Sequence, residues 1–352
     1  MKKFPIYILL TIVGFLSAAP EARAVSFDLD SIATWGKFPR FCVNTYRWGC
    51  DFFNGFDTAY VSGTGYKFNA KITADSWMDG YSFVLPNKEF MFLKSDPSTS
   101  TGIYLTYLAV SVGYDINISR LFGGVDRSRQ RYRFGFNCSL FTVEAYLSKN
   151  DIGTTLKRFG DRHHGDKYNL PFYGVNNSTW GIDAYYFFNH KRYSEAASFN
   201  YSRIQRRSQG SFLIGLSYYA QDLNFDFSEM PEQIRDRLPE SWPDNRYTVF
   251  TKNYAVRFGY GFNWVFAPKW VFGVSESPTV GVRKGLINNH ELEKISFSLY
   301  NRLNMSVVWN SGRLFAGATC KFDIAIVNDR ETTYAGGVLS GEAVFGYRFN
   351  LW

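Results

Sequence analysis

The feature that most limits what this chain can fold into is a two-residue alternation of large apolar and small or polar side chains. It is clearest over 254–266. Successive side chains of a β-strand point to opposite faces, whereas a helix would spread these apolar residues round its whole circumference. The segment therefore predicts a strand with one apolar face. Its apolar members are Tyr254, Val256, Phe258, Tyr260, Phe262, Trp264 and Phe266.

The same pattern recurs and predicts an all-β chain. Aromatic residues make up 19% of the 352 residues although the mean hydropathy is −0.22. Soluble proteins bury their aromatics, whereas outer-membrane barrels display them towards lipid and keep polar side chains in the lumen. We predict a closed antiparallel transmembrane β-barrel of about 12 strands, within a range of 10–14, against the alternative of a soluble β-sandwich. The predicted strands are 66–75, 80–93, 102–118, 131–140, 180–188, 193–203, 210–221, 254–266, 270–282, 295–308, 313–325 and 336–350.

The turn signals indicate an up-and-down meander. Segments 267–269 and 310–312 are short connections, whereas 222–246 is long and polar. This predicts short periplasmic turns and longer outer loops. The insertion at 149–178 contradicts a strict alternation, because it would lie on the periplasmic side. Either it contains an extra hairpin or the strand count is wrong.

The first residues resemble a targeting signal. A basic start and an apolar run from Ile6 to Ala19 precede small residues at Ala22 and Ala24, which predicts a signal peptide cut after Ala24. We expect 1–24 to be the signal peptide, 25–60 an N-terminal periplasmic segment leading into the barrel, and 61–352 the barrel. The predicted location is the outer membrane of a Gram-negative bacterium. The expected partners are outer-membrane lipid and the barrel-assembly machinery, since the chain ends on an aromatic residue, Trp352.

Four cysteines would enter an oxidising compartment. Cys42 and Cys50 are near neighbours and could form a disulfide, whereas Cys138 and Cys320 fall in separate predicted strands. None has zinc-ligand spacing, and we predict no metal and no cofactor. The net charge of +8 includes no concentrated basic run, so nucleic acid is not an expected partner.

The alternation also predicts which charged side chains face the lumen. Asp75, Asp115, Asp183 and Glu342 are the acids expected there, and their number is smaller than that of the bases. Two interpretations stay open: a passage or site for a small anionic solute, or a plug of paired charges. The basic residues expected in the lumen are Lys67, Lys71, Arg131, Arg133, Arg257, Arg302, Arg313, Lys321 and Arg348. On the same basis Gly259 and Asn263 should tolerate polar substitution better than the lipid-facing Phe258.

Catalysis has few candidate residues. His163 and His164, flanked by acids in 161–166, could supply a base for a barrel enzyme acting on lipid or glycan. The ordinary interpretation of both is a solvated loop. His190 and His290 are expected in turns or loops. The acidic stretch from Asp222 to Glu232 lacks the oxygen spacing of a calcium loop.

The stretch 187–220 resembles an uncharacterised family of barrel-like proteins from the Bacteroides group, a domain of unknown function. The matching residues include Phe188-Asn189, Phe199, Gln205-Arg206-Arg207-Ser208 and Gly210-Ser211, and the ending Gly346-Tyr347-Arg348-Phe349 is similar. The resemblance implies an outer-membrane barrel and no activity. We therefore predict a barrel without evident catalytic machinery that passes or binds a small solute. The alternatives are a barrel enzyme and a soluble periplasmic β-protein.

Overall fold

The computed structural model describes residues 34, 36–107, 110–118, 129–150, 153–161, 165–288, 290–291, 296–328 and 332–350. The chain divides into two compact units, Met1–Phe52 with Leu351–Trp352, and Phe53–Asn350. Helix α3 (Lys37–Asn54) begins in the first unit and ends two residues into the second. Within the described residues, no helix is both long and apolar enough to cross a membrane.

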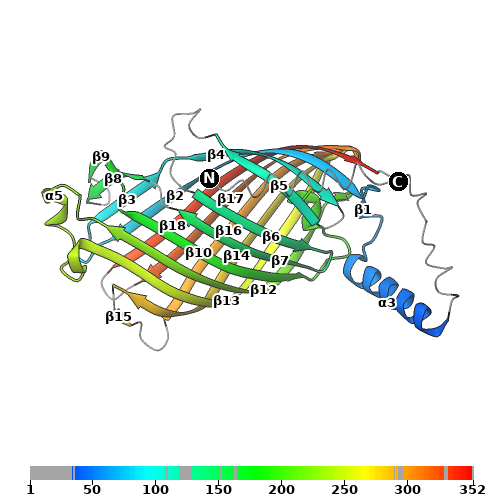
Figure 1. Cartoon of the computed structure of the whole chain (residues 1–352), viewed down its shortest axis with the longest axis horizontal. Coiled ribbons are helices and arrows are strands. Elements are labelled where there is room, and N and C mark those ends of the chain that lie inside the picture. Colours follow the sequence, from blue (N-terminus) through cyan, green and yellow to red (C-terminus); the bar gives the residue numbers. More distant parts are fainter. Residues whose placement is uncertain are drawn as a thin grey trace, which may run out of the picture. The chain divides into compact units, whose positions relative to one another are not determined.

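The second unit is built on one antiparallel 16-stranded sheet. In Figure 1 its long strands run side by side at a common tilt, and the sheet is strongly curled. Twelve strands form its wall, each hydrogen-bonded to the next. Among the described residues, the wall ends at β5 on one side and at β6 on the other. In spatial order the wall is β5 (Val110–Asn117), β4 (Ser98–Tyr107), β2 (Phe68–Val84), β18 (Thr333–Phe349), β17 (Leu314–Asn328), β16 (Ser296–Asn310), β14 (Trp270–Ile287), β13 (Arg246–Ala267), β12 (Gln209–Asp226), β10 (Val175–Phe187), β7 (Phe141–Asn150) and β6 (Arg129–Asn137).

The two ends of the wall differ. At what we call the turn end, β13 joins β14 through 268–269 and β16 joins β17 through 311–313. At the opposite loop end the connections are long. The elements there are β3 (Phe90–Ser95), β8 (Thr154–Gly160), β9 (Asp166–Phe172), α5 (Glu232–Arg235), η2 (Pro243–Asn245) and β15 (His290–Glu291). Because β8 and β9 form a hairpin that pairs with β3, the extra hairpin expected as one explanation for 149–178 is present, and it lies at the loop end.

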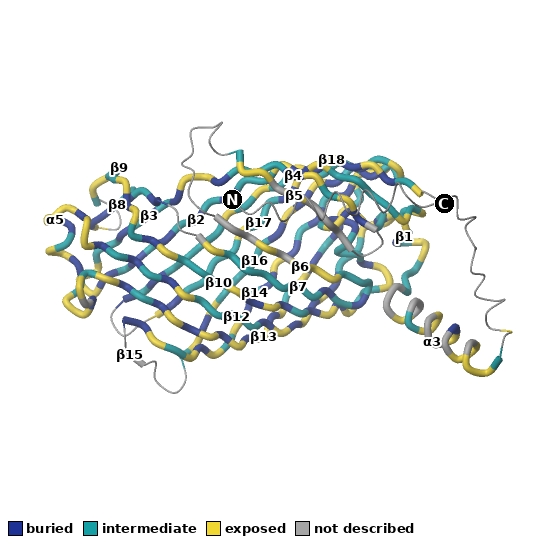
Figure 2. Tube along the Cα trace, in the orientation of Figure 1, coloured by how far each residue is buried: buried dark blue, intermediate teal, exposed yellow. Residues whose placement is uncertain are grey.

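The wall is apolar outside and polar inside. Along β13 the odd-numbered side chains from Thr251 to Arg257 are buried, and the even-numbered ones from Lys252 to Phe258 are exposed. Figure 2 shows buried and exposed positions alternating along neighbouring strands. The described outward residues of the 254–266 pattern all lie on the predicted face. The burial pattern is thus inverted relative to a soluble protein, in which apolar side chains are the buried ones.

The number of wall strands agrees with the predicted number only because four errors cancel. The predicted strands 66–75 and 80–93 share one long strand, β2, and 193–203 is not a wall strand. In compensation, 102–118 is a hairpin of two strands, β4 and β5, and β7 was missed. Alternation alone does not locate a tight turn when the apolar residues before and after it all have odd numbers or all have even numbers.

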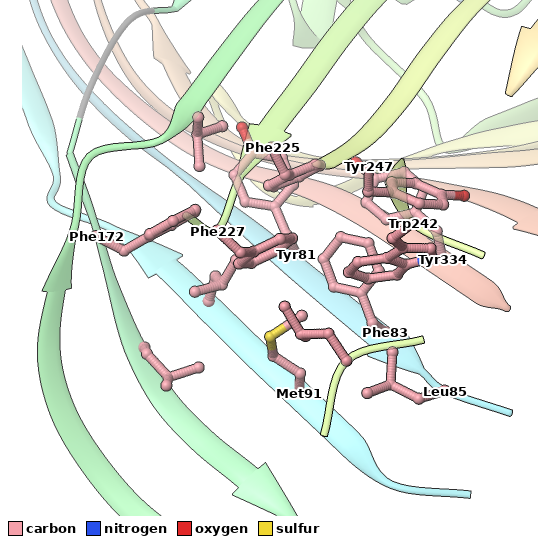
Figure 3. Packing of buried hydrophobic residues seen from close by; sticks show 14 of the residues in the cluster. Tyr81, Phe83, Leu85, Met91, Phe172, Phe225, Phe227, Trp242, Tyr247 and Tyr334 are labelled. Atoms are coloured by element: carbon pink, nitrogen blue, oxygen red, sulfur yellow. The ribbon is translucent and has the colours of Figure 1, made fainter. Parts of the chain in front are cut away.

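The loop end is filled by an aromatic core. Phe83 lies 5.5 Å from Trp242, 5.3 Å from Tyr247 and 5.2 Å from Tyr334, measured between ring centroids. Figure 3 shows these rings together with Phe225 and Phe227. Trp242 comes from the long connection between β12 and β13, whereas Phe83, Tyr247 and Tyr334 come from wall strands. This connection therefore packs onto inward-facing rings at the strand ends.

A second segment occupies the turn end. Residues 188–208, which we call the turn-end insert, contain α4 (Glu195–Ser198) and β11 (Arg203–Gln205). β11 pairs with the short strand β1 (Val61–Gly63). The ring of Tyr201 stacks on Phe315 of β17 at 5.5 Å. The predicted strand 193–203 is therefore wrong: its apolar residues alternate because they pack inside the wall.

Asn263 of β13 anchors the insert. Its Nδ2 donates to the carbonyl of Ser194 at 2.8 Å and to Oε1 of Gln205 at 3.0 Å, and its Oδ1 accepts from Oγ of Ser198 at 2.6 Å. The expected tolerance of Asn263 to substitution is therefore wrong, since the side chain is fully buried and bonded at both ends. Gly259 is no more tolerant, because an added Cβ would meet the carbonyl oxygen of Glu276.

Candidate functional site: a lumenal cavity

A cavity of about 200 Å³ lies in the lumen. It is lined by inward-facing residues of wall strands, and the packed rings of Tyr81 and Tyr334 from the loop-end core also border it. About seven water molecules would fill this volume, since each takes about 30 Å³ in the liquid. The space is thus suited to a small solute rather than to a wide aqueous channel.

A charged network crosses the lumen beside this cavity. Asp183 on β10 is 3.2 Å from Nη2 of Arg257 on β13, and 3.4 Å from Nη1 of Arg302 on β16. Arg302 also contacts Asp323 at 2.7 Å and Glu144 on β7 at 3.5 Å. The strand pairs that these contacts join, β10 with β13, β10 with β16 and β7 with β16, are not adjacent in the wall, so the contacts are made across the interior. The lumen is narrow enough for side chains to bridge it.

The local sequence explains how Asp183 and Arg257 meet. They lie on β10 and β13, on either side of β12, where their directly paired residues are Ser217 and Gly215. These small residues leave room for the guanidinium of Arg257 to reach over β12, and its Nη2 also lies 3.4 Å from Oγ of Ser217. Both charged side chains are almost completely buried. A charge buried in this way requires a partner, which each supplies to the other.

Aromatic rings complete the network. The guanidinium of Arg257 lies 5.9 Å from the ring centroid of Tyr185 and 5.7 Å from that of Tyr300, within the range of a cation–π contact. The hydroxyl of Tyr300 donates to Asp323 at 2.5 Å. Tyr185, whose inward orientation interrupted the predicted alternation of 180–188, is therefore part of the lumenal packing.

The predicted lumenal bases divide into three groups. Arg257, Arg302, Lys321 and Arg348 lie inside the wall, and Lys71 lies 5.1 Å over the ring of Tyr104 on the inner face. Lys67 and Arg313 do not face the lumen. Lys67 is exposed before β2 begins, and Arg313 is exposed in the β16–β17 turn, 5.2 Å over the outward ring of Tyr347. The predicted alternation was carried one residue too far in each case, because β2 begins at Phe68 and β17 at Leu314. The remaining two are Arg131 and Arg133, whose side chains lie outside the described residues, as does that of Asp115.

The expected excess of positive charge is offset by acids that the alternation did not place in the lumen. Asp79, Glu144 and Asp323 line the cavity together with Asp183. Asp323 could have been found, because it shares the parity of Lys321 on β17. Glu144 could not, because β7 was not predicted. Of the other expected acids, Asp75 accepts from Oγ of Ser100 at 2.7 Å on the inner face, and Glu342 lies half-buried on the inner side of β18.

Glu195 is a further acid on the turn-end insert. It borders a second cavity of about 30 Å³ together with Glu144, Lys321 and Arg302. Oγ1 of Thr142 donates to its carboxylate at 3.3 Å. Burial raises the pKa of the Glu195 carboxyl to about 8, and the neighbouring Glu144 adds to the rise. The carboxyl is therefore protonated in the folded protein at neutral pH.

This raised pKa predicts a pH-dependent stability. Between the ordinary value of 4.5 and about 8, the folded protein keeps a proton that the unfolded chain releases, so the free energy of unfolding falls as pH rises through this range. Glu195→Gln, which cannot ionise, should flatten the dependence of the unfolding midpoint on pH. The exposed Glu229→Gln is the matched control and should keep the original slope. An unchanged slope in Glu195→Gln would contradict this assignment.

The remaining candidates give no second site within the described residues. His163 and His164 lie outside the described residues, so the enzyme hypothesis based on them stays a prediction. His190 lies in the turn after β10 with Nδ1 3.3 Å from the carbonyl of Phe187, and His290 belongs to β15. No group of three or more His, Cys, Asp or Glu side chains that could hold a metal is found in the part of the chain that the structure describes.

The cysteines give a mixed result. Cys138 and Cys320 are free thiols. The side chains of Cys42 and Cys50 lie outside the described residues, and both positions belong to α3. Eight residues of α-helix separate two Cα atoms by about 12 Å, whereas a disulfide requires about 7 Å or less. The predicted disulfide and this helix exclude each other, and the pairing stays a prediction.

Several solved structures of outer-membrane proteins align along most of the chain. The outer membrane protease OmpT from Escherichia coli is 8% identical, with 82% of this chain and 98% of that chain covered and a TM-score of 0.33. OprG from Pseudomonas aeruginosa is 9% identical, with 82% and 100% covered and a TM-score of 0.24. The P. putida toluene transporter TodX is 6% identical, with 81% and 91% covered and a TM-score of 0.23. At these values nothing that those proteins cleave or transport transfers to this chain.

The sequence itself identifies the family of this chain. No curated protein matches the sequence. Residues 56–349 match the model of one family, which confirms the resemblance to a domain of unknown function, while the Bacteroides origin stays a prediction. The matched region includes every strand of the wall and the turn-end insert. The chain therefore belongs to the family described as Domain of unknown function (DUF4421).

Proposed function

We propose that this chain is an integral outer-membrane β-barrel protein that holds a small polar solute in a closed lumen and does not conduct ions freely. The observation that carries the proposal is the inverted burial: apolar side chains cover the outside of the wall, and charged ones are buried inside it. Phe258, Leu216 and Phe297, on three different strands, are 48%, 68% and 71% exposed. In water such a surface would associate, whereas in lipid it is the stable outward face.

The spacing of outward aromatics supports a membrane location. One row joins Trp180, Tyr218 and Tyr254 across β10, β12 and β13, with ring centroids 5.1 Å apart at both contacts. The rings of Trp264 and Phe266 lie 5.5 Å apart near the turn end, tilted against each other. The ten residue steps from Tyr254 to Trp264 span about 33 Å along the strand, or about 25 Å along the axis at a tilt of about 40°. That is about the height of the apolar band of such barrels.

The lumenal charges suggest the class of solute. The cavity is lined by three bases, Arg257, Arg302 and Lys321, and by four acids, so its lining has no excess of positive charge. In place of the anionic solute expected from the sequence, we propose an uncharged or zwitterionic one that hydrogen-bonds to the tyrosines and carboxylates. On this proposal the turn end faces the periplasm. The surrounding partner is outer-membrane lipid, and the barrel-assembly machinery inserts the chain.

Planar-bilayer recording of the purified protein tests the proposal. The intact protein should be heat-modifiable on a gel, as a folded barrel is, and should show little conductance because both ends of the lumen are packed. Asn263→Ala removes three hydrogen bonds to the turn-end insert and should raise the open probability several-fold. Ser208→Ala, which removes one bond to the backbone of Val265 at the insert's exposed edge, is the control and should change conductance little.

Two results would overturn the proposal. Recovery of the native protein in the soluble periplasmic fraction would exclude a membrane barrel. Large, steady conductance of the unmodified protein would exclude a closed lumen.

A further inference from the structure

Helix α3 carries an exposed aromatic face. Phe38, Phe41, Trp48 and Phe52 are 75%, 65%, 63% and 48% exposed, and the rings of Trp48 and Phe52 stack with centroids 5.2 Å apart. At 100° per residue, these four positions fall within a sector of about 80° of the helix. Large aromatic side chains seldom stay in water as a continuous helix face, so this face requires a partner.

The other sides of the helix carry three exposed bases, while Val43, on the side away from the aromatic face, is buried. Lys37, Arg40 and Arg47 are exposed on its flank and opposite side. The only acid in the sequence of α3 is Asp51. A helix with Trp and Phe on one face and Lys and Arg on the other is typical of segments that lie in a membrane interface. Indole and phenyl rings settle at the headgroup level, and the bases attract anionic phosphates.

The chain tethers this helix to the turn end of the barrel. Asp57 lies three residues after Asn54, the last residue of α3, and its backbone N–H donates to the carbonyl of Lys191 in the turn-end insert at 2.7 Å. Lys269 and Arg313 are exposed at that end of the wall, and the guanidinium of Arg313 covers the outward ring of Tyr347. Bases beside outward aromatics mark the level of the lipid headgroups there.

We infer that α3 binds the anionic phospholipid surface of the membrane that holds the barrel, on the leaflet at the turn end, with Phe38, Phe41, Trp48 and Phe52 among the acyl chains. This inference rests on the proposed membrane location. A second copy of the chain and a protein partner are the competing occupants of the aromatic face. Lipid is favoured because Lys37 flanks the face and the helix carries three bases against one acid, a charge that complements a phosphate surface.

Spin labels on the full chain test the inference. In a background with Cys42, Cys50, Cys138 and Cys320 changed to serine, one variant carries Thr45→Cys and a matched control carries Arg47→Cys. Position 45 lies between Phe41 and Trp48 on the aromatic side, and position 47 is about 200° further round the helix. Each protein is reconstituted in vesicles of phosphatidylethanolamine with phosphatidylglycerol, and insertion of the barrel is checked by heat-modifiable migration.

The expected result is a label at 45 that is accessible to oxygen and shielded from a water-soluble nickel chelate, with the reverse at 47. Replacement of both lipids by phosphatidylcholine should shift the label at 45 towards the chelate. Water accessibility at both positions with the barrel inserted would overturn the inference and leave the proposed function intact. Shielding of the label at 45 from both reagents would overturn it in favour of a protein partner. Failure of the barrel to insert would overturn both.

Discussion

Replacing Asp183 with alanine is expected to lower the free energy of unfolding by about 3–5 kcal/mol. Its carboxylate is the counter-charge of the buried Arg257 and one of three that surround Arg302. Its removal leaves the guanidinium of Arg257 without an ion-pair partner among the described residues, in a site that water reaches poorly. Urea unfolding in lipid vesicles, followed by tryptophan fluorescence, measures the change.

A double variant separates the loss of the pair from the loss of packing. Arg257→Met with Asp183→Ala removes both charges, and it should recover a large part of the stability lost in Asp183→Ala alone. Lys252→Met is the control, since this base is exposed on the outer side of the same strand. A loss smaller than about 1 kcal/mol in Asp183→Ala would mean that water solvates the network, and the lumen would then be open.

Phe258→Arg should destabilise the barrel by about 2–4 kcal/mol, because a base on the lipid face near the middle of the bilayer has no water to solvate it. Phe258 is 48% exposed on the outer side of β13, near the midpoint between the two aromatic levels at Tyr254 and Trp264. Phe258→Leu keeps the face apolar and should cost far less. Both variants are measured by the same unfolding experiment.

If Phe258→Arg and Phe258→Leu were equally stable, the outer face would be in water. The same basic substitution on the inner face is expected to be harmful for another reason. Asn263→Arg would break the bonds that hold the turn-end insert, so its effect should appear as conductance as well as instability.

Much of the wall could be predicted from the sequence because lipid outside and polar side chains inside impose a strict two-residue period. The 254–266 pattern predicted the outward residues of β13 correctly. The period fails where inward residues are apolar. Tyr185 and Phe187 are buried within the wall because Tyr193 of the insert packs against them. Their inward apolar side chains make the sequence of β10 look less regular than a lipid-facing strand, although they mark the place where the insert fills the lumen.

The lumenal site was only half predictable. The two-residue period predicted that Arg257, Arg302 and Asp183 face the lumen. It does not say which strands face each other across a narrow lumen. The contact between Arg302 and Glu144 joins β16 to β7, which are far apart in the sheet order, and no local pattern encodes it. The buried position of Asn263 was missed for the same reason: its partners come from a segment that sequence alternation had placed in the wall.

The position of the sheet's two ends indicates where new chain termini could be placed. The first and last wall strands, β2 and β18, pair along their full length, from Phe68 opposite Phe349 to Val84 opposite Thr333. The described wall instead ends at β5 and β6, which follow one another in the chain. A circular permutation that places new termini between β5 and β6, and joins the original ends near Phe68 and Phe349, would interrupt none of the described ladders between wall strands. We therefore expect a chain cut between β5 and β6 to keep the whole described wall together.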